Sequence, residues 1–167
     1  QSTSPNYIFL ASLDMARHQL ATEGKDLVRR AVELSAYLRE KLNTISGIAT
    51  MEYTDIQETI INYDSTKVLT DAKGLGLTGV EFEHLLRNHR IEVELVQANH
   101  VLVLITIGDT KESVDILIKA VRAVSDDVLR DSSRIRSIDV AGLYEPSSES
   151  ALLPEPQVCV TPRNAMY

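Results

Sequence analysis

The spacing of apolar residues changes at Gly47, and this change divides the chain into two kinds of structure. From residue 5 to residue 46 apolar side chains recur every three or four positions, which is the period of an α-helix. Ser4 and Pro5 suit the N-cap and the first helical position. Gly24 interrupts the pattern, so we expect a long helical arm that can bend there. Apolar residues on both faces of its first half indicate contact with protein that this chain does not contain.

After Gly47 the pattern predicts short strands and two further helices. The expected strands cover residues 48–53, 59–63, 67–70, 91–96 and 101–107. Thr78-x-x-Glu81 and Asp109-x-x-Glu112 match capping boxes, which start helices. The last helix is expected to bury Val114, Ile116, Leu117, Ala120, Val121 and Val124. The order strands, helix, strands, helix predicts a small α+β sandwich domain with its helices on one face of the sheet.

Composition excludes several classes of partner. A net charge of −7 argues against binding to nucleic acid or to an anionic membrane surface. No apolar run is long enough to span a bilayer, and no Cys/His set has the spacing of a zinc site. Cys159 is the single cysteine, so an internal disulfide is impossible, which fits a reducing cytoplasm. We therefore expect a cytoplasmic protein without a metal centre.

Three groups of residues in the α+β region are candidate sites. Gly74–Gly79 lacks the ending of a nucleotide-binding loop, and a strand-to-helix turn that needs a positive φ explains it better. Asp64 precedes a strand and is expected to bind backbone N–H groups of its turn. Glu92 and Glu94 alternate with apolar residues, so both carboxylates should point to one face. That face is either an ordinary exposed polar surface or a cleft.

The N-terminal motif is the strongest candidate for ligand binding. Ser2, Thr3 and Ser4 come directly before Pro5 and a helical pattern. The start of a helix offers free N–H groups and the positive end of its dipole to an anion, typically a phosphate, and the hydroxyls add further donors. On local pattern alone, an ordinary capped helix is the better explanation of the motif.

The same motif resembles a signature of a known enzyme family. Residues 1–7, followed by Ala-Ser-Leu-Asp-Met-Ala-Arg at 11–17, are similar to a segment of the pyridoxal-phosphate-dependent ornithine/lysine/arginine decarboxylases. These enzymes have the aspartate-aminotransferase fold, known as fold type I. Further similarity lies at Asp64–Val68, between Gly74 and Thr110, and at Thr161–Ala165. The resemblance is continuous over residues 1–125.

The resemblance implies a fold, a cofactor and a set of site residues. Residues 1–46 would link to a large cofactor-binding domain, 47–127 would form the small C-terminal domain, and 128–167 would be a linker and the start of a further subdomain. Ser2, Thr3 and Ser4 would approach the phosphate of pyridoxal 5′-phosphate (PLP) bound to the neighbouring subunit of a homodimer or higher oligomer. Glu94, rather than Glu92, would meet the distal cation of the amino-acid substrate.

The family's cofactor-bearing lysine lies before this signature, so the resemblance places no catalytic residue within the chain. The implied activity is decarboxylation of arginine, lysine or ornithine to a polyamine or polyamine precursor, and the 167-residue chain alone should be inactive. Two other hypotheses stay open at this point. The region 48–125 would suffice for a small regulatory or ligand-binding α+β domain, and the chain could also be an assembly subunit without catalysis.

Overall fold

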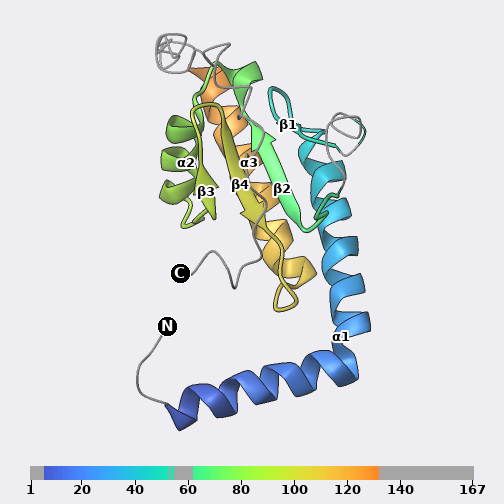
Figure 1. The fold of residues 1–167 in the computed structure, drawn as a ribbon. Helices are drawn as coiled ribbons and strands as arrows, with labels where there is room; N and C mark the ends of the chain where they lie inside the picture. The colour runs from blue at the N-terminus through green and yellow to red at the C-terminus, as the bar shows by residue number, and fades with distance from the viewer. Residues whose placement is uncertain (1–5, 53, 55–61, 132–167) are drawn as a thin grey trace, which may run out of the picture.

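The computed structural model describes residues 6–52, 54 and 62–131. Figure 1 shows the elements, which in chain order are α1 (Tyr7–Leu42), β1 (Ala49–Thr50), β2 (Lys67–Asp71), the short 3-10 helix η2 (Lys73–Leu75), α2 (Gly79–Asn88), β3 (Leu95–Val96), β4 (His100–Leu104) and α3 (Lys111–Arg130). Helices and a sheet therefore combine in one α+β unit, as predicted.

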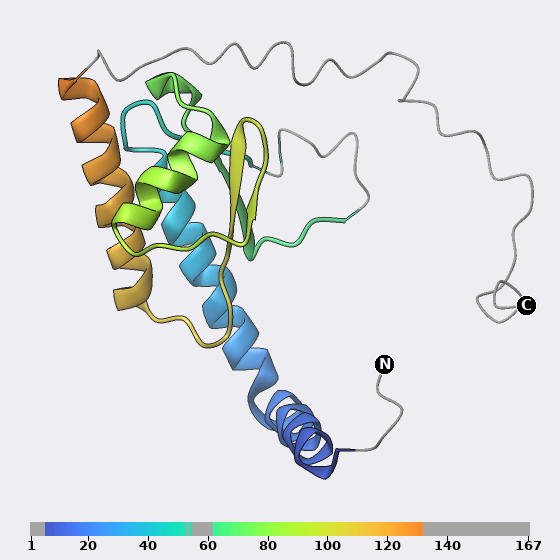
Figure 2. The ribbon, with the colours of Figure 1, turned by 90° about the vertical axis from the view of Figure 1, so that its left-hand side faces the viewer.

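The sheet has four strands in the order β1-β2-β4-β3, and every neighbouring pair is antiparallel. The second half of α1, α2 and α3 cover one face (Figure 2). Along β2, buried Val68 and Thr70 alternate with exposed Lys67, because successive side chains point to opposite faces. The sheet therefore has one face packed on the helices, as the strand-and-helix order predicts.

The core lies between this face and the three helices. Phe82 of α2 and Leu38 of α1 are among its largest fully buried side chains. Its other buried apolar members are Ala31, Leu34, Leu42, Ile45, Ile48, Val68, Ala72, Leu75, Leu77, Leu86, Val101, Ile105, Val114, Leu117, Ile118, Ala120, Val121, Val124 and Val128. All of these lie at or after residue 31, so the first half of α1 adds nothing to the core.

The start of α1 differs from the prediction. Asn6 is the N-cap, and its side-chain oxygen accepts hydrogen bonds from the N–H groups of Ile8 at 3.0 Å and Phe9 at 3.3 Å. Asparagine is as good a cap as serine, and here it supplies the oxygen for the first free donors. The helix therefore begins at Tyr7, two residues later than a cap at Ser4 would give.

The helix α1 is continuous but bends between its two halves, as Figure 1 shows. Near the bend, the Thr22 hydroxyl donates to the carbonyl of His18 at 2.9 Å, and Gly24 follows two residues later. A back-bonded threonine and a glycine are both known causes of helix bending. The predicted bend near Gly24 is thus present, with Thr22 as a contributor that the apolar pattern does not reveal.

Two predicted strands are shorter in the structure. Of residues 91–96 only Leu95 and Val96 form β3, and β4 ends at Leu104 rather than at residue 107. The N–H of Glu94 donates to the Leu102 carbonyl at 2.9 Å, although Leu95 is the ladder partner of Leu102. Glu94 and Leu95 thus both face Leu102, which is the pattern of a β-bulge, and regular strand pairing stops there.

The other strand predictions have mixed outcomes. The first strand is limited to Ala49 and Thr50 within the predicted range 48–53. Residues 59–61 of the second lie outside the described residues, and Asn62 and Tyr63 are not in a strand. The predicted strand 67–70 is confirmed and extends to Asp71.

The second predicted capping box, at the start of α3, is wrong in both of its residues. Thr110, not Asp109, is the N-cap, and its partner in the box is Ser113 rather than Glu112. Asp109 instead closes the preceding turn by accepting hydrogen bonds from the N–H of Thr106 at 2.7 Å and its hydroxyl at 2.9 Å. The Thr78–Glu81 box at the start of α2 is confirmed.

Ile116 is the one wrong member of the predicted buried face of α3. It is 58% exposed, whereas Val114, Leu117, Ala120, Val121 and Val124 are buried. At about 100° per residue, Ile116 lies about 200° around the helix from Val114 and so on the opposite side.

Asp109 makes the stability of the α3 start depend on pH. Burial raises the pKa of its carboxyl, but the hydrogen bonds from Thr106 and Ser113 outweigh burial and hold the pKa below its usual value. The ionised form therefore stabilises the fold fully above the unfolded-state pKa of about 3.9, and this contribution is lost as pH falls through the lower folded-state pKa. Urea unfolding at a series of pH values should show less acid dependence for Asp109→Asn than for the parent. Equal acid dependence would contradict this role.

Candidate functional site

The bulge before β3 places Glu92 and Glu94 on the exposed edge of the sheet. Both residues are exposed, whereas Val93 between them packs against the core. Glu92, Val93 and Glu94 therefore follow the predicted alternation, but Leu95, its other apolar member, is 48% exposed. Since β3 is an edge strand, its lead-in is accessible to a ligand or to another protein surface.

Arg87 distinguishes the two carboxylates. Its guanidinium, on the last turn of α2, forms ion pairs with Glu83 and with Glu92, the latter at 3.1 Å. No hydrogen bond or ion pair of the Glu94 side chain is formed with the residues that the structure describes. Glu92 is thus already paired, and Glu94 is the carboxylate without a partner among the described residues. The Glu83–Arg87 pair, four residues apart on one helix, can be recognised from the sequence. The Arg87–Glu92 pair depends on the fold.

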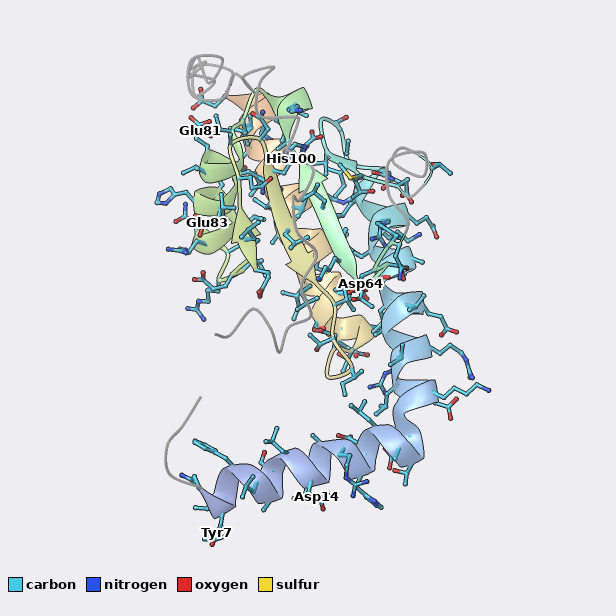
Figure 3. All side chains as sticks on the ribbon, in the orientation of Figure 1. Tyr7, Asp14, Asp64, Glu81, Glu83 and His100 are labelled. Carbon is cyan, nitrogen blue, oxygen red and sulfur yellow. The ribbon has the colours of Figure 1, made fainter. Side chains whose placement is uncertain are left out.

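The first half of α1 carries a large exposed apolar surface. Tyr7 and Ile8 are each 79% exposed, and Phe9, Leu10, Leu13, Met15 and Leu20 are also exposed. Figure 3 shows Tyr7 and Asp14 on this half of the helix, which projects away from the sheet. Contiguous apolar surface of this extent marks a contact site. The expectation that this half lies against further protein is consistent with its exposure.

Ser2, Thr3 and Ser4 lie outside the described residues. The helix that follows them starts at Tyr7, with no acidic residue in its first turn. In Figures 1 and 2 this start lies well apart from β3, which directly follows Glu94. Within one chain, the structure therefore does not bring the predicted phosphate-binding end of α1 to the predicted substrate carboxylate.

The glycine-containing loop and the Asp64 turn have structural roles. Gly76 has a φ of +70° at the end of η2, which confirms a turn that requires a positive φ. Gly79 has a different role, because a Cβ there would fall on the Gln97 carbonyl oxygen and lie 2.7 Å from that of His100. The Asp64 side chain accepts hydrogen bonds from the hydroxyl of Thr66 at 2.7 Å and from its N–H at 3.0 Å, and these bonds lower the pKa of Asp64.

Sequence reasoning missed a buried arginine. Arg39 is only 5% exposed, and its guanidinium donates to the carbonyls of Ser65 and Lys67, both at 2.8 Å, and to the Tyr63 hydroxyl at 2.6 Å. These bonds fasten the lead-in of β2 to α1 and satisfy both terminal nitrogens of the buried charge, while its Nε has no hydrogen-bond partner among the described residues. The only sequence signal is that Arg39 lies next to Leu38 in the apolar pattern of α1. The carbonyls that Arg39 binds are distant in sequence.

A second network joins α1 to α3. The Tyr37 hydroxyl donates to Asp115 at 2.8 Å, and Lys111 lies 2.8 Å from the same carboxylate and 4.8 Å from the centre of the Tyr37 ring. The hydrogen bond from Lys111 lowers the pKa of Asp115 and raises the pKa of Lys111 itself. Every polar group of this set has a partner, so the network holds the helices together.

The described part of the chain offers neither a metal centre nor a membrane span. Across residues 6–52, 54 and 62–131, no group of three or more His, Cys, Asp or Glu side chains could hold a metal ion. No helix among them is long and apolar enough to cross a membrane.

Comparison with known proteins gives a consistent result. Arginine decarboxylases of Halalkalibacterium halodurans and Bacillus subtilis are 36% and 35% identical to this chain, and each match covers 99% of the chain and 32% of the relative. The chain therefore spans about a third of the length of these curated relatives. No family model matches.

Among solved structures, the constitutive lysine decarboxylase of E. coli has a similar fold. The TM-score is 0.57 at 19% sequence identity, and the match covers 78% of this chain and 25% of the lysine decarboxylase. At this identity the likeness concerns the fold alone. Over almost its whole length, then, this chain is similar in sequence to one part of arginine decarboxylases and in fold to part of a lysine decarboxylase, and the resemblance expected from its N-terminal motif is confirmed.

Proposed function

We propose that this chain forms part of a PLP-dependent decarboxylase that converts arginine, lysine or ornithine to the corresponding amine and CO₂. The observation that carries the proposal is the match to arginine decarboxylases over 99% of the chain at 36% identity. The matched relatives favour arginine among the three substrates. We place this activity in the cytoplasm, in keeping with the single cysteine, and in polyamine biosynthesis, because the product amines are polyamines or their precursors.

The residues at the N-terminus fit a phosphate. Ser2, Thr3 and Ser4 offer hydroxyl donors that add no competing charge, and they precede a helix whose positive end carries no acidic residue in the first turn. In the proposed enzyme these hydroxyls hold the phosphate of PLP bound by the neighbouring subunit. When bound, PLP supplies a ring that accepts the electron pair left as the substrate carboxylate departs.

Glu94 is the proposed partner of the substrate's distal cation. A guanidinium or ammonium group binds most strongly to an ionised carboxylate through charge-assisted hydrogen bonds. Glu92 is occupied by Arg87, whereas Glu94 is exposed on the bulge and has no partner among the described residues. Glu94 therefore orients the substrate from the side of the small domain, whereas Glu92 is already paired with Arg87.

The domain organisation follows from the same proposal. Residues 1–46 form the arm to a large cofactor-binding domain, 47–127 the small domain, and 128–167 a linker and the start of a further subdomain. The exposed apolar residues of the first half of α1 support this organisation, because they need a covering surface. We propose that the large domain and the second subunit of a homodimer or higher oligomer provide that surface.

A labelling experiment separates this function from a ligand-binding domain without catalysis. The longer polypeptide that carries this chain is incubated with PLP, reduced with borohydride and digested for mass spectrometry. We expect a phosphopyridoxyl group on one lysine upstream of Gln1 and none on the lysines of residues 1–167. Labelling of no specific lysine, or of a lysine within the chain, would contradict the proposal.

Removing the three N-terminal hydroxyls should weaken PLP binding. Each hydrogen bond to a charged group contributes about 1.5–3 kcal/mol, so the triple variant Ser2→Ala/Thr3→Ala/Ser4→Ala should raise the Kd for PLP at least about tenfold in the longer polypeptide. Equilibrium dialysis measures this Kd. Thr44→Ala, at an exposed turn after α1, is the matched control and should leave it unchanged. An unchanged Kd in the triple variant would contradict the assignment.

A further inference from the structure

The face of the sheet that the helices do not cover carries four leucines. Leu69 of β2, Leu102 of β4 and Leu95 of β3 form one row across the sheet, because Leu102 is the register partner of both Leu69 and Leu95. Leu104 follows two residues later on β4 and therefore lies on the same face. All four lie outside the core, whose helices occupy the opposite side of the sheet in Figure 2. We call this apolar surface the leucine face.

Glu94 lies at the edge of the leucine face. The bulge sets Glu94 and Leu95 together opposite Leu102, so a carboxylate and an exposed leucine occupy adjacent positions on the edge strand. Leu95 is 48% exposed, and the Glu94 side chain has no partner among the described residues. A ligand with a cationic head and an apolar stem suits this combination, because such a stem packs on apolar surface while its head meets the carboxylate.

The charged residues of β2 on the same face have partners of their own. Lys67 lies 3.9 Å from the carboxylate of Asp64, and the Asp71 side chain accepts a hydrogen bond from the N–H of Lys73 at 3.1 Å. Both residues belong to β2, whereas Glu94 borders β3 at the other side of the row. Glu94 is therefore the carboxylate that a cation at this end of the leucine face would meet.

We infer that the methylene stem of the basic amino-acid substrate lies on Leu95 and Leu102 while its distal cation binds Glu94. This inference rests on the proposed function. Adjacent strands lie about 4.8 Å apart, so the two leucines offer a strip of apolar surface to a short alkyl stem. Burial of one methylene strengthens binding about fourfold. The two leucines therefore select the substrate by its stem, and Glu94 selects it by its charge.

A series of n-alkylguanidines isolates the contribution of the stem. Methyl-, ethyl-, propyl- and butylguanidine carry the cation and a stem of increasing length, without the amino and carboxyl groups of the substrate. Isothermal titration calorimetry gives the Kd of each for the PLP-loaded longer polypeptide. We expect the Kd to fall about fourfold with each added methylene in the parent, and less than about twofold in Leu95→Ala. Leu95 is on an edge strand and half exposed, so the variant should fold.

Leu129→Ala is the matched control. Leu129 is a 54% exposed leucine of α3, on the other side of the sheet, and its variant should keep the fourfold steps. Absence of the steps in the parent would overturn the inference, as would their loss in Leu129→Ala. Steps that persist in Leu95→Ala would also overturn it, because protein rather than the substrate stem would then cover Leu95.

Release of CO₂ by the same preparation keeps the two possible failures apart. A preparation that releases CO₂ from a basic amino acid but keeps its fourfold steps in Leu95→Ala would contradict the stem contact alone. A preparation that releases none would contradict the proposed function, whatever the alkylguanidines show.

Discussion

Replacing Glu94 by glutamine in the longer polypeptide should raise the KM for arginine about ten- to hundredfold, since a hydrogen bond between charged groups contributes about 1.5–3 kcal/mol. Glu94 is exposed and lies on the edge of the sheet, so the substitution should leave the fold intact. Steady-state kinetics with the three basic amino acids measures the effect. The loss should be largest for the preferred substrate, because its distal cation is best aligned with the carboxylate.

Glu92→Gln is the matched control. Glu92 has the same chemistry, lies two residues away and is already paired with Arg87 at 3.1 Å. Its removal should change the KM by less than about threefold, in line with the small contribution of an exposed ion pair. Equal effects of the two substitutions would contradict the assignment of Glu94, and a larger effect at Glu92 would transfer the role to that residue.

Replacing Gly79 by alanine should destabilise the fold by about 2–3 kcal/mol, although alanine favours helices. Gly79 is the first residue of α2, and its Cα faces the turn between β3 and β4. An added Cβ would fall on the Gln97 carbonyl oxygen and lie 2.8 Å from the backbone nitrogen of His100. Backbone atoms cannot rotate aside as a side chain can, so the helix and the turn must separate. The free energy of unfolding in urea measures this loss.

Gly24→Ala is the same chemical change with the opposite expected sign. Gly24 lies inside α1, and an added Cβ would meet only the Leu20 side chain, at 3.5 and 3.6 Å, which is ordinary contact. Alanine should therefore stabilise the chain by up to about 1 kcal/mol. If both variants changed stability in the same direction, the close contact at Gly79 would not be the cause of the change seen in Gly79→Ala.

Short-range patterns accounted for much of this fold in advance. The Thr78–Glu81 capping box, the strand at residues 67–70 and the α+β order follow from spacing alone, because caps and alternation act over a few residues. The bend of α1 was predictable for the same reason, from Gly24 in an apolar helical pattern. These features need no knowledge of distant contacts.

Predictions were wrong where two oxygens compete or where a contact is distant in sequence. Asn6 rather than Ser4 caps α1, and Thr110 rather than Asp109 caps α3, because residues one or two positions apart can each supply the capping oxygen. The bulge at Glu94 shortens β3 and depends on pairing with Leu102 across the sheet. No local pattern encodes that pairing.

In the candidate site, too, local patterns were predictable and contacts between distant residues were not. Sequence placed Glu92 and Glu94 on exposed positions but could not tell them apart, since Arg87 approaches Glu92 only in the folded chain. The buried Arg39 was missed entirely, because its carbonyl partners come from the lead-in of β2. The phosphate-binding role of Ser2, Thr3 and Ser4 stays a prediction from family resemblance.

The proposed decarboxylase activity is measured by the release of CO₂ from carboxyl-labelled arginine, lysine and ornithine. The longer polypeptide that carries this chain, supplied with PLP, should release labelled CO₂ from at least one of the three, and Glu94→Gln should reduce the release at low substrate concentration. The 167-residue chain alone, assayed with PLP in parallel, should release none. Absence of CO₂ release by the PLP-loaded longer polypeptide from all three amino acids, or release by the isolated chain, would contradict the proposed function.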